Sequence, residues 1–438
     1  MRFRSATLVG VTAAAAFVGC ARNAGVGGTA RLPPDAQVLR FARLVDGTGA
    51  VLDDAVVVVS GERFVSVGSG DRALLLRGAT VIDLRPLVAI PGLIDMHTHM
   101  AYWWDRAPGT RPIGGGGTPR TAAELASAAM ENARKTLETG VTTVRDLGAS
   151  RYVDVLMRDR INRGEAVGPR MFVSGYGLSK LTNPPAAGAA PAWLRGRIAN
   201  LAEIAGAVKT QVDSGADVIK MYGSQGSYQN VSTTQTFTYE EMKAAVDAAH
   251  AAGKRIAIHS YGPEGARDAV RAGANTVEHP VDLDDTTLAE MVRRGVIYVP
   301  TVDHNRYYAE HRAEYGWTEQ QAAALDAFRA RNLETVRRAI RAGVKIAMGS
   351  DAVYTMFGQN THELGFFVQA GMTPLQALAS ATVVGAEALG MSDRLGRVAP
   401  GYLADIAAVE GDPTRDIGAV INGVRWVMKG GMVVVDRR

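Results

Sequence analysis

Helical and strand-like patterns alternate along the middle of the chain, from about residue 91 to residue 395. Segments with the 3.6-residue period of amphipathic helices are followed by short apolar segments that suit buried parallel strands. Helices are predicted over residues 122–137, 153–161, 201–212, 240–252, 262–272, 288–294 and 319–342. Strands are predicted within 91–100 and over 141–144, 171–173, 217–221, 255–259, 276–279, 296–299 and 344–348. Eight such strands predict an α/β fold, the (β/α)8 or TIM barrel.

Both ends of the chain show a different pattern, in which short runs of β-forming residues are separated by turn residues. These runs lie within residues 37–90 and 396–438, with turns such as Asn422-Gly423. A barrel over residues 91–395, inserted between the two parts, would bring them together. The sequence therefore predicts a small β-sandwich domain built from both chain ends.

Residues 1–20 have the composition of an export signal. Two early arginines precede an apolar run over 6–18, and a small residue then comes before Cys20, as in the cleavage site of bacterial lipoproteins. Residues 21–36, rich in Gly, Ala and Pro, are expected to form a tether. We therefore expect an exported protein on the periplasmic side, attached to a membrane only by a lipid on Cys20. An ordinary secretory signal is the alternative.

Composition and charge narrow the class of protein. Of the 438 residues, 47% are hydrophobic and 21% are charged, as in a globular protein with a large core. The formal net charge of +4 gives no indication of nucleic-acid binding. Cys20 is the only cysteine, so no intrachain disulfide can form. The expected partners are a small-molecule substrate and further copies of the chain in a homo-oligomer.

The first candidate metal ligands lie in the segment PGLIDMHTHM, from Pro91 to Met100. His97 and His99 are two residues apart, so both point to the same side of a strand, which would be the lumen of the barrel. Imidazole is a common zinc ligand, and catalytic groups of TIM barrels gather at the C-terminal ends of the strands. Taken alone, the pair could equally be hydrogen-bonded histidines of the core.

Four more polar residues stand at the ends of predicted strands, namely Lys220 in DVIKMYG, His259 in RIAIHSYG, His279 in TVEHP and Asp351 in KIAMGSD. Each has a structural alternative, such as a salt bridge for Lys220 and a loop cap for Asp351. A lysine between apolar residues is costly to bury unless it is paired or neutralised. The recurrence of such residues at the strand ends favours one catalytic centre over separate structural roles.

These segments resemble the amidohydrolase superfamily, and within it the imidazolonepropionase-like and prolidase-like branch. The resemblance covers about residues 37–436 and also rests on LVDGTGAVLDDAVVVVSGERFVSVG, GVTTVRDLG, FTYEEMKAAVDAAHAAGKRIAIHSYG, AGANTVEHP, ELGFFVQAGMTPLQALASAT and LGRVAPGYLADIAAVEGDP. It implies a site for two divalent metal ions, expected to be zinc. By this resemblance one ion is held by His97, His99 and Asp351, the other by His259 and His279, and Lys220, carboxylated on its side-chain nitrogen, bridges both.

The resemblance also implies a reaction. A hydroxide between the two metals would attack an amide carbonyl, and Asp351 would accept the proton of the water and deliver it to the leaving nitrogen. N-acyl amino acids or short dipeptides are the expected substrates. Several dipeptide-cleaving relatives carry Gly-Gly-His where this chain has the sequence Lys180 to Pro184, so the dipeptide substrate stays open.

Substrate-binding residues are expected near the metal ligands. Tyr261, two positions after His259, resembles a family position close to the scissile carbonyl, although packing at the barrel rim explains it equally well. His304 and Tyr307 are expected in the substrate pocket. The basic residues considered as partners of a substrate carboxylate are Arg145, Lys180 and Arg306.

Two other classes of function stay open at this point. The same metal site could open a cyclic amide or a lactone, because metals activate water without selecting the electrophile. A non-catalytic surface lipoprotein is a more remote alternative, because all the expected metal-binding residues are present. Metal content distinguishes this last class from both enzymes, and a panel of substrates distinguishes the two enzymes.

Overall fold

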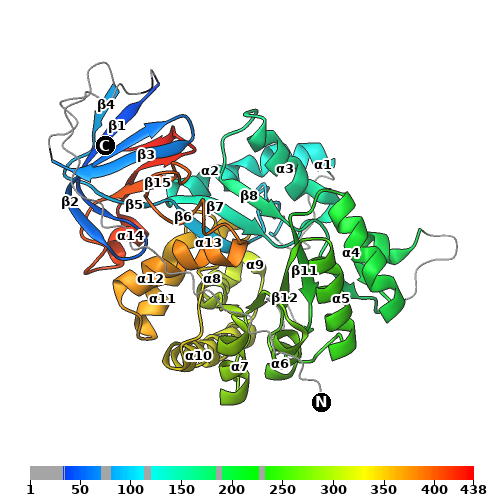
Figure 1. Ribbon diagram of the computed structural model, residues 1–438. Coiled ribbons are helices and arrows are strands. Elements are labelled where there is room, and N and C mark those ends of the chain that lie inside the picture. The colour runs from blue at the N-terminus through cyan, green and yellow to red at the C-terminus, as the bar shows by residue number, and fades with distance from the viewer. Residues whose placement is uncertain (1–32, 34, 71–79, 113–119, 184–189, 226–231) are drawn as a thin grey trace, which may run out of the picture.

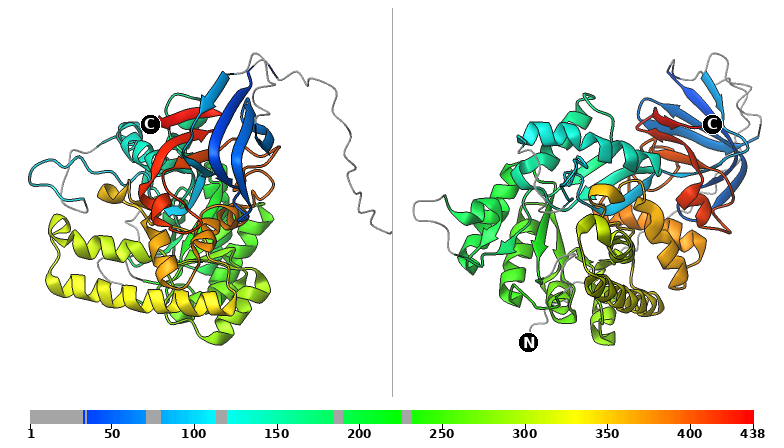
Figure 2. Two further views of the ribbon diagram at one scale, coloured as in Figure 1. Left: turned by 90° about the vertical axis from the view of Figure 1, so that its left-hand side faces the viewer. Right: turned by 180° about the vertical axis from the view of Figure 1, so that it is seen from behind.

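The computed structural model describes residues 33, 35–70, 80–112, 120–183, 190–225 and 232–438. The predicted export signal with Cys20, and most of the predicted tether, lie outside these residues. Within the described part of the chain, no helix is both long enough and apolar enough to cross a membrane. A β-sheet region and a larger α/β region lie side by side (Figure 1 and Figure 2).

The β-sheet region is one eight-stranded sheet that contains both ends of the described chain, as predicted. Its strands are β1 (Gln37–Val45), β2 (Val51–Ser60), β3 (Arg63–Ser69), β4 (Thr80–Asp83), β5 (Val88–Pro91), β15 (Ile406–Val409), β16 (Val424–Lys429) and β17 (Met432–Asp436). The order is β17-β16-β15-β5-β1-β2-β3, and β4 also pairs with β1. Because β5 runs antiparallel to β15, the blue and red strands of Figure 1 belong to one sheet.

This sheet surrounds a core of its own. Phe41 on β1 and Phe64 on β3 are buried in the same cluster as Trp426 and Met428 on β16. The first half of β1 pairs with β4 and its last residues pair with β5, so the sheet opens at β1 into two layers around these side chains. The layers correspond to the predicted β-sandwich.

The predicted barrel strands form two groups of parallel strands. One group is β6 (Leu93–Thr98), β7 (Val141–Asp146) and β8 (Arg170–Val173), and the other is β11 (Val218–Tyr222), β12 (Arg255–His259), β13 (Thr276–Glu278) and β14 (Ile297–Val299). A bridge between Leu178 and Met221 joins the two groups after β8. The predicted eighth strand bridges to β14 at Ile346, and its Met348 carbonyl accepts a hydrogen bond from Met96 of β6. These contacts connect the strands in the order of a TIM barrel.

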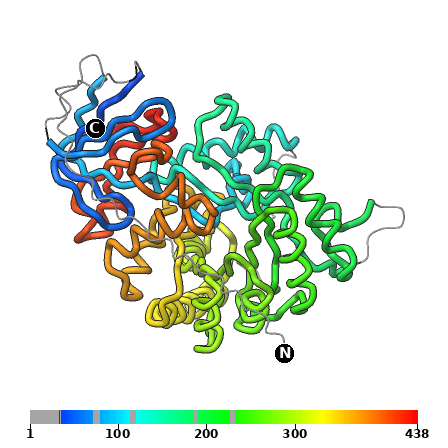
Figure 3. Tube along the Cα trace, viewed as in Figure 1, coloured from blue at the N-terminus to red at the C-terminus, as the bar shows by residue number. Residues whose placement is uncertain are grey.

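Helices surround these strands, as the trace in Figure 3 shows. They are α1 (Ala122–Ala128), α2 (Met130–Glu138), α3 (Val153–Asn162), α4 (Ile204–Asp213), α5 (Tyr239–Ala251), α6 (Pro263–Ala272), α7 (Asp285–Arg294), α8 (Val302–Glu310), α9 (Arg312–Tyr315), α10 (Glu319–Ala342), α11 (Glu363–Gln369), α12 (Pro374–Ser380) and α13 (Val383–Leu389). A short α14 (Gly418–Asn422) precedes β16, and a small pair of strands, β9 (Ser179–Lys180) and β10 (Arg197–Ile198), lies in the loop after β8.

Local capping explains where the helices begin and end. α10 has the predicted bounds because Thr318 and Gln321 form a capping box at its start, and Gly343 takes a left-handed conformation at its end. The predicted helix 122–137 instead divides into α1 and α2 at Ala129, where ψ is −8°. The predicted helix 201–212 starts as a 3-10 turn that is capped by Asn200, and α4 follows it.

Candidate metal centre and active site

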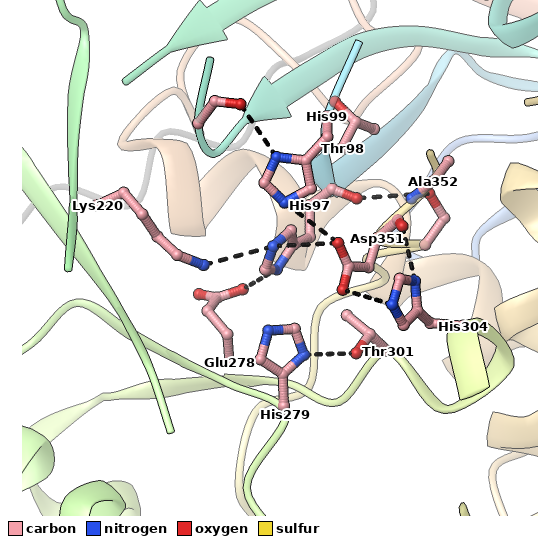
Figure 4. A network of polar contacts seen from close by, with 12 residues as sticks. His97, Thr98, His99, Lys220, Glu278, His279, Thr301, His304, Asp351 and Ala352 are labelled. Atoms are coloured by element: carbon pink, nitrogen blue, oxygen red, sulfur yellow. Dashed lines mark hydrogen bonds and ion pairs between the residues drawn. The ribbon is translucent and has the colours of Figure 1, made fainter. Parts of the chain in front are cut away.

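The six predicted metal-binding side chains line one cavity at the C-terminal ends of the barrel strands. Its volume is about 150 Å³, and its lining consists of His97, His99, Tyr102, Lys220, Tyr222, His259, Tyr261, His279, His304, Tyr308, Asp351 and Val353. The six predicted residues are all buried. They come from β6, β11, β12, the end of β13 and the segment after the eighth strand, so the barrel brings together residues that are far apart in the sequence. Figure 4 shows His97, His99, Lys220, His279 and Asp351 of this set.

His97, His99 and Asp351 form the tightest group in the cavity. One ligand atom from each lies within 4.8 Å of the others. Asp351 Oδ1 is 3.5 Å from His97 Nε2 and 3.3 Å from His99 Nε2. Two imidazoles and one carboxylate at this spacing are a donor set that suits zinc.

Hydrogen bonds on the outer side of the rings orient the histidines toward the cavity. His97 Nδ1 donates to Glu278 Oε2 (2.9 Å), and His99 Nδ1 donates to the Gly148 carbonyl (3.1 Å). His279 Nδ1 contacts Thr301 Oγ1 at 2.6 Å. Because carboxylate and carbonyl oxygens only accept, Nε2 of His97 and of His99 keeps its lone pair. Metal-binding histidines in proteins typically have such an outer partner.

Two buried groups of the cavity lack an ordinary partner among the described residues. His259 Nε2 is buried and has no hydrogen-bond partner there. Lys220 is 1% exposed, and its Nζ lies 3.4 Å from His97 Nε2, without an ion pair to any acid of the described chain. A buried imidazole nitrogen without a hydrogen bond and a buried amine without an ion pair are both costly in a purely structural core. Both fit a centre whose ligands face a cation.

The electrostatics of the cavity favour the protonation states in which these side chains can bind a metal ion. Burial holds the pKa values of His259 and His279 well below the ordinary value, so both rings are neutral. Burial alone would raise the pKa of Asp351, but His304 and His97 outweigh it and hold that pKa well below its usual range. Burial also lowers the pKa of Lys220 to about 8, which increases the share of the neutral amine.

Two of the three predicted substrate-binding residues line the same cavity. The Tyr261 ring lies edge-on to His259 at 4.6 Å and is 3% exposed. His304, on α8, donates from Nδ1 to the Asp351 carbonyl (2.8 Å) and places Nε2 3.4 Å from Asp351 Oδ2.

Tyr307 does not line this cavity, in contrast to the prediction. It faces an adjoining cavity with Trp104, Arg106 and His311, and its hydroxyl contacts Thr355. The residue of α8 that accompanies His304 is Tyr308, four positions later, because residues i and i+4 share one face of a helix. The sequence analysis did not predict a helix here, and a helix over this segment would have favoured Tyr308.

The three basic residues considered for a substrate carboxylate are already paired within the protein. Arg145 pairs with Glu278, Lys180 pairs with Glu241, and Arg306 pairs with Asp303. Arg145 is 2% exposed and lies in the barrel interior. These internal ion pairs argue against the proposed role for each of them.

Several residues of the site were missed by the sequence analysis. Glu278 is the partner of His97, and Tyr102 stacks on His99 with a ring separation of 4.7 Å. Asp95 accepts hydrogen bonds from the Ser350 backbone N–H (2.9 Å) and hydroxyl (2.6 Å), which ties β6 to the segment of Asp351. Strand alternation places Asp95, His97 and His99 in one row and would have indicated Asp95.

Comparison with known proteins agrees with this geometry. The model of the amidohydrolase family matches residues 88–434. Ochratoxinase from Aspergillus niger is 30% identical over 420 residues, which cover 89% of this chain and 84% of that protein. Imidazolonepropionase from Symbiobacterium thermophilum is 25% identical, with coverage of 89% and 93%. A crystal structure of a Xaa-Pro dipeptidase with bound methionine superposes with a TM-score of 0.81 at 30% identity, covering 91% of this chain and 99% of that one.

The family match spans both the barrel and the C-terminal strands, and the barrel fold agrees with that of the superposed dipeptidase. The chain therefore belongs to the amidohydrolase family and is a hydrolase that acts on carbon–nitrogen bonds.

Proposed function

We propose that this protein is a binuclear zinc enzyme that hydrolyses the amide bond of N-acyl amino acids or short dipeptides. The observation that carries the proposal is the convergence of six buried side chains in one cavity. In the described chain, His259 Nε2 has no hydrogen-bond partner, and Lys220 forms no ion pair. The names of the ochratoxinase and Xaa-Pro dipeptidase relatives support an amide or peptide substrate.

The donor set fits two divalent ions. His97, His99 and Asp351 would hold one ion, and His259 and His279 would hold the other. Lys220 would bridge them after carboxylation of its Nζ, because a carbamate is an anion with two oxygens. A neutral amine is the form that reacts with carbon dioxide, and the buried position of Lys220 increases the share of that form. When bound, such ions lower the pKa of water and polarise a carbonyl group.

The protein side chains would supply orientation and proton transfer. Asp351 directs Oδ1 toward the two histidines of β6 and Oδ2 toward His304, so one carboxylate faces both groups. Its low pKa keeps the carboxylate ionised at neutral pH, so it is in the form that can accept a proton and later give it to the leaving nitrogen. Tyr261 and His304 would contact the substrate beside the scissile carbonyl.

The lining of the cavity also bears on substrate choice. Among the described residues, its lining contains tyrosines and His304 but no arginine, and its one lysine, Lys220, would be carboxylated. A substrate carboxylate would therefore be bound by hydroxyl and imidazole groups rather than by a guanidinium. Substrates whose carboxylate is replaced by a neutral amide should lose less affinity here than at an arginine-containing site.

The test uses protein without residues 1–20, purified with zinc and bicarbonate. Release of free amino acid from a panel of N-acyl amino acids and dipeptides is measured with and without a chelator. Release that the chelator abolishes supports amide hydrolysis and ranks the accepted side chains. No release from zinc-loaded protein would refute the proposed substrate class and favour a cyclic amide or a lactone.

The cellular setting is a separate proposal that rests on the sequence. We propose that the chain is exported, that a lipid on Cys20 holds it at a membrane on the periplasmic side, and that it forms a homo-oligomer. Cys20→Ala should move the protein from the membrane fraction to the soluble fraction. An unchanged distribution would refute the lipid anchor. Light scattering of the purified protein tests the oligomer, and a monomeric mass would refute it.

A further inference from the structure

Arg145 crosses the barrel interior beneath the metal cavity. It belongs to β7, but its guanidinium reaches residues of β13 in the other group of barrel strands. Nε donates to the Met96 carbonyl (2.7 Å), Nη1 to Thr276 Oγ1 (2.8 Å) and Nη2 to Glu278 Oε1 (2.8 Å). With Arg145 2% exposed and Glu278 fully buried, this ion pair is shielded from water.

Glu278 connects Arg145 to the metal cavity. One oxygen, Oε1, accepts hydrogen bonds from Arg145 and Thr276, and the other, Oε2, accepts from His97 Nδ1 (2.9 Å). Since an ionised carboxylate can only accept, the proton of the neutral His97 ring lies on Nδ1. The lone pair then lies on Nε2, the nitrogen that faces Asp351 and Lys220.

We propose that Arg145 and Glu278 act together as positioning residues that select the metal-binding tautomer of His97. The inference deepens the proposed function and depends on it. The Arg145 guanidinium can only donate hydrogen bonds, so the side chain at position 278 must offer it an oxygen that accepts. Glu278 can satisfy this requirement and still accept from His97, because both of its oxygens are acceptors. No neutral side chain of the same shape can do both.

The substitution Glu278→Gln makes this requirement measurable. Glutamine has one acceptor and one donor end, and Arg145 would bind the acceptor end. The NH₂ group would then face His97 and donate to Nδ1, so the ring proton would move to Nε2 and block coordination. Removing the guanidinium as well, in Arg145→Met/Glu278→Gln, lets the amide turn its carbonyl toward His97. The double variant should therefore bind metal better than the single variant.

The experiment measures zinc affinity by competition with a coloured chelator for the wild-type protein and these two variants. Glu278→Gln should weaken the binding of one zinc ion by about 10- to 100-fold, as expected for a lost outer partner. The double variant should recover part of that loss. The visible spectrum of the cobalt-substituted protein should change in Glu278→Gln and return toward wild type in the double variant.

Asp405→Asn provides a matched control. Asp405 is also a buried carboxylate paired with an arginine, Arg170, but it lies near the start of β6 and β8, at the opposite end of the barrel. Its loss should lower stability without changing zinc affinity. Equal zinc affinity in wild type and Glu278→Gln would overturn the inference, as would a double variant that binds no better than the single one. A wild-type protein that binds no zinc would instead refute the proposed function.

The tautomer of His97 can also be measured directly in the metal-free wild-type protein, so the inference remains testable if a variant does not fold. The nitrogen chemical shifts of the His97 ring, assigned by their loss in His97→Asn, report which nitrogen carries the proton. Protonated Nδ1 and unprotonated Nε2 are expected. The opposite tautomer in the wild-type protein would overturn the inference.

Discussion

At the scale of single residues, Asp351 contacts polar groups through all its oxygens. His97 and His99 face Oδ1, and His304 faces Oδ2 and the carbonyl. Asp351→Asn keeps an oxygen at this place but cannot carry the transferred proton. We expect kcat to fall by about 10²- to 10⁴-fold, with zinc content close to that of wild type. Steady-state kinetics and metal analysis check this expectation.

The exposed residue Asp285 offers a control for the same substitution, because its side chain is 93% exposed and pairs only with Arg338 in the described structure. Asp285→Asn should retain wild-type kcat. Normal turnover in Asp351→Asn would remove Asp351 from the role of proton carrier.

The buried carboxyl group of Asp154 predicts a pH-dependent stability. Burial raises its pKa from 3.8 to about 6, although backbone N–H groups of Gly175 and Val155 oppose this effect. The folded protein therefore binds more protons than the unfolded chain between these values, and the stability contributed by Asp154 falls as pH rises through that window.

In Asp154→Asn the side chain is neutral at every pH, so the stability contributed at this position does not fall as pH rises. In metal-free protein, raising the pH from 5 to 7 should lower the unfolding free energy of the wild type relative to that of the variant. The expected change over this pH range is on the order of 1 kcal/mol, because the folded wild-type protein must release one proton that the unfolded chain has already lost. Urea denaturation at several pH values measures it, and a difference that moves the other way would contradict the assignment.

The roles of some single residues could be predicted from the sequence, and those of others could not. The metal-binding candidates were found because a buried strand has few reasons to end in a histidine, a lysine or an aspartate. The sequence could not choose among Arg145, Lys180 and Arg306, because the partner of Arg145, Glu278, is 133 positions away and only the arrangement of the strands brings the two together. Tyr307 was misplaced because its direction depends on a helix, α8, that the apolar pattern did not predict.

At the scale of elements, the eighth strand approaches β6 very closely at Gly349. A Cβ atom added there would lie 2.4 Å from Val299 Cγ1 and 2.9 Å from His97 Cβ. Gly349→Ala should therefore push His97 from its place, lower zinc affinity, and destabilise the protein by about 1–3 kcal/mol. Chelator competition and urea denaturation measure the two effects.

Gly365 in α11 is the matching control, because an added Cβ would meet only Ile421 Cδ1, at the ordinary distance of 3.6 Å. Gly365→Ala should keep the zinc affinity and at least the stability of the wild-type protein. Unchanged zinc affinity in Gly349→Ala would show that His97 tolerates the displacement.

Helices with strong end signals were predicted more accurately than those without them. Thr318, Gln321 and Gly343 define α10 at both ends, and the predicted bounds agree with the structure. Nothing comparable marks the break at Ala129, where α2 begins without a side-chain cap. The predicted eighth strand, 344–348, is not a regular strand in the structure: it forms a bridge to β14 at Ile346 and accepts a hydrogen bond from β6 at Met348, a detail that apolar periodicity does not contain.

At the scale of the whole molecule, metal binding should stabilise the fold. The proposed ligands come from both groups of barrel strands, so unfolding separates them. Zinc should raise the melting temperature of chelator-treated protein in a concentration-dependent way, equivalent to about 2.7 kcal/mol at 100 times the dissociation constant. Differential scanning calorimetry measures the change. A melting temperature that does not respond to zinc would contradict a site shared by the two groups.

The pairing of β5 with β15 joins segments roughly 300 residues apart, so the ribosome makes β5 long before β15. Until β15 leaves the ribosome, β5 keeps an unpaired edge, and at about 5–20 residues per second this lasts for tens of seconds. The edge of β5 therefore stays open to other chains until β15 has been made and has paired with it.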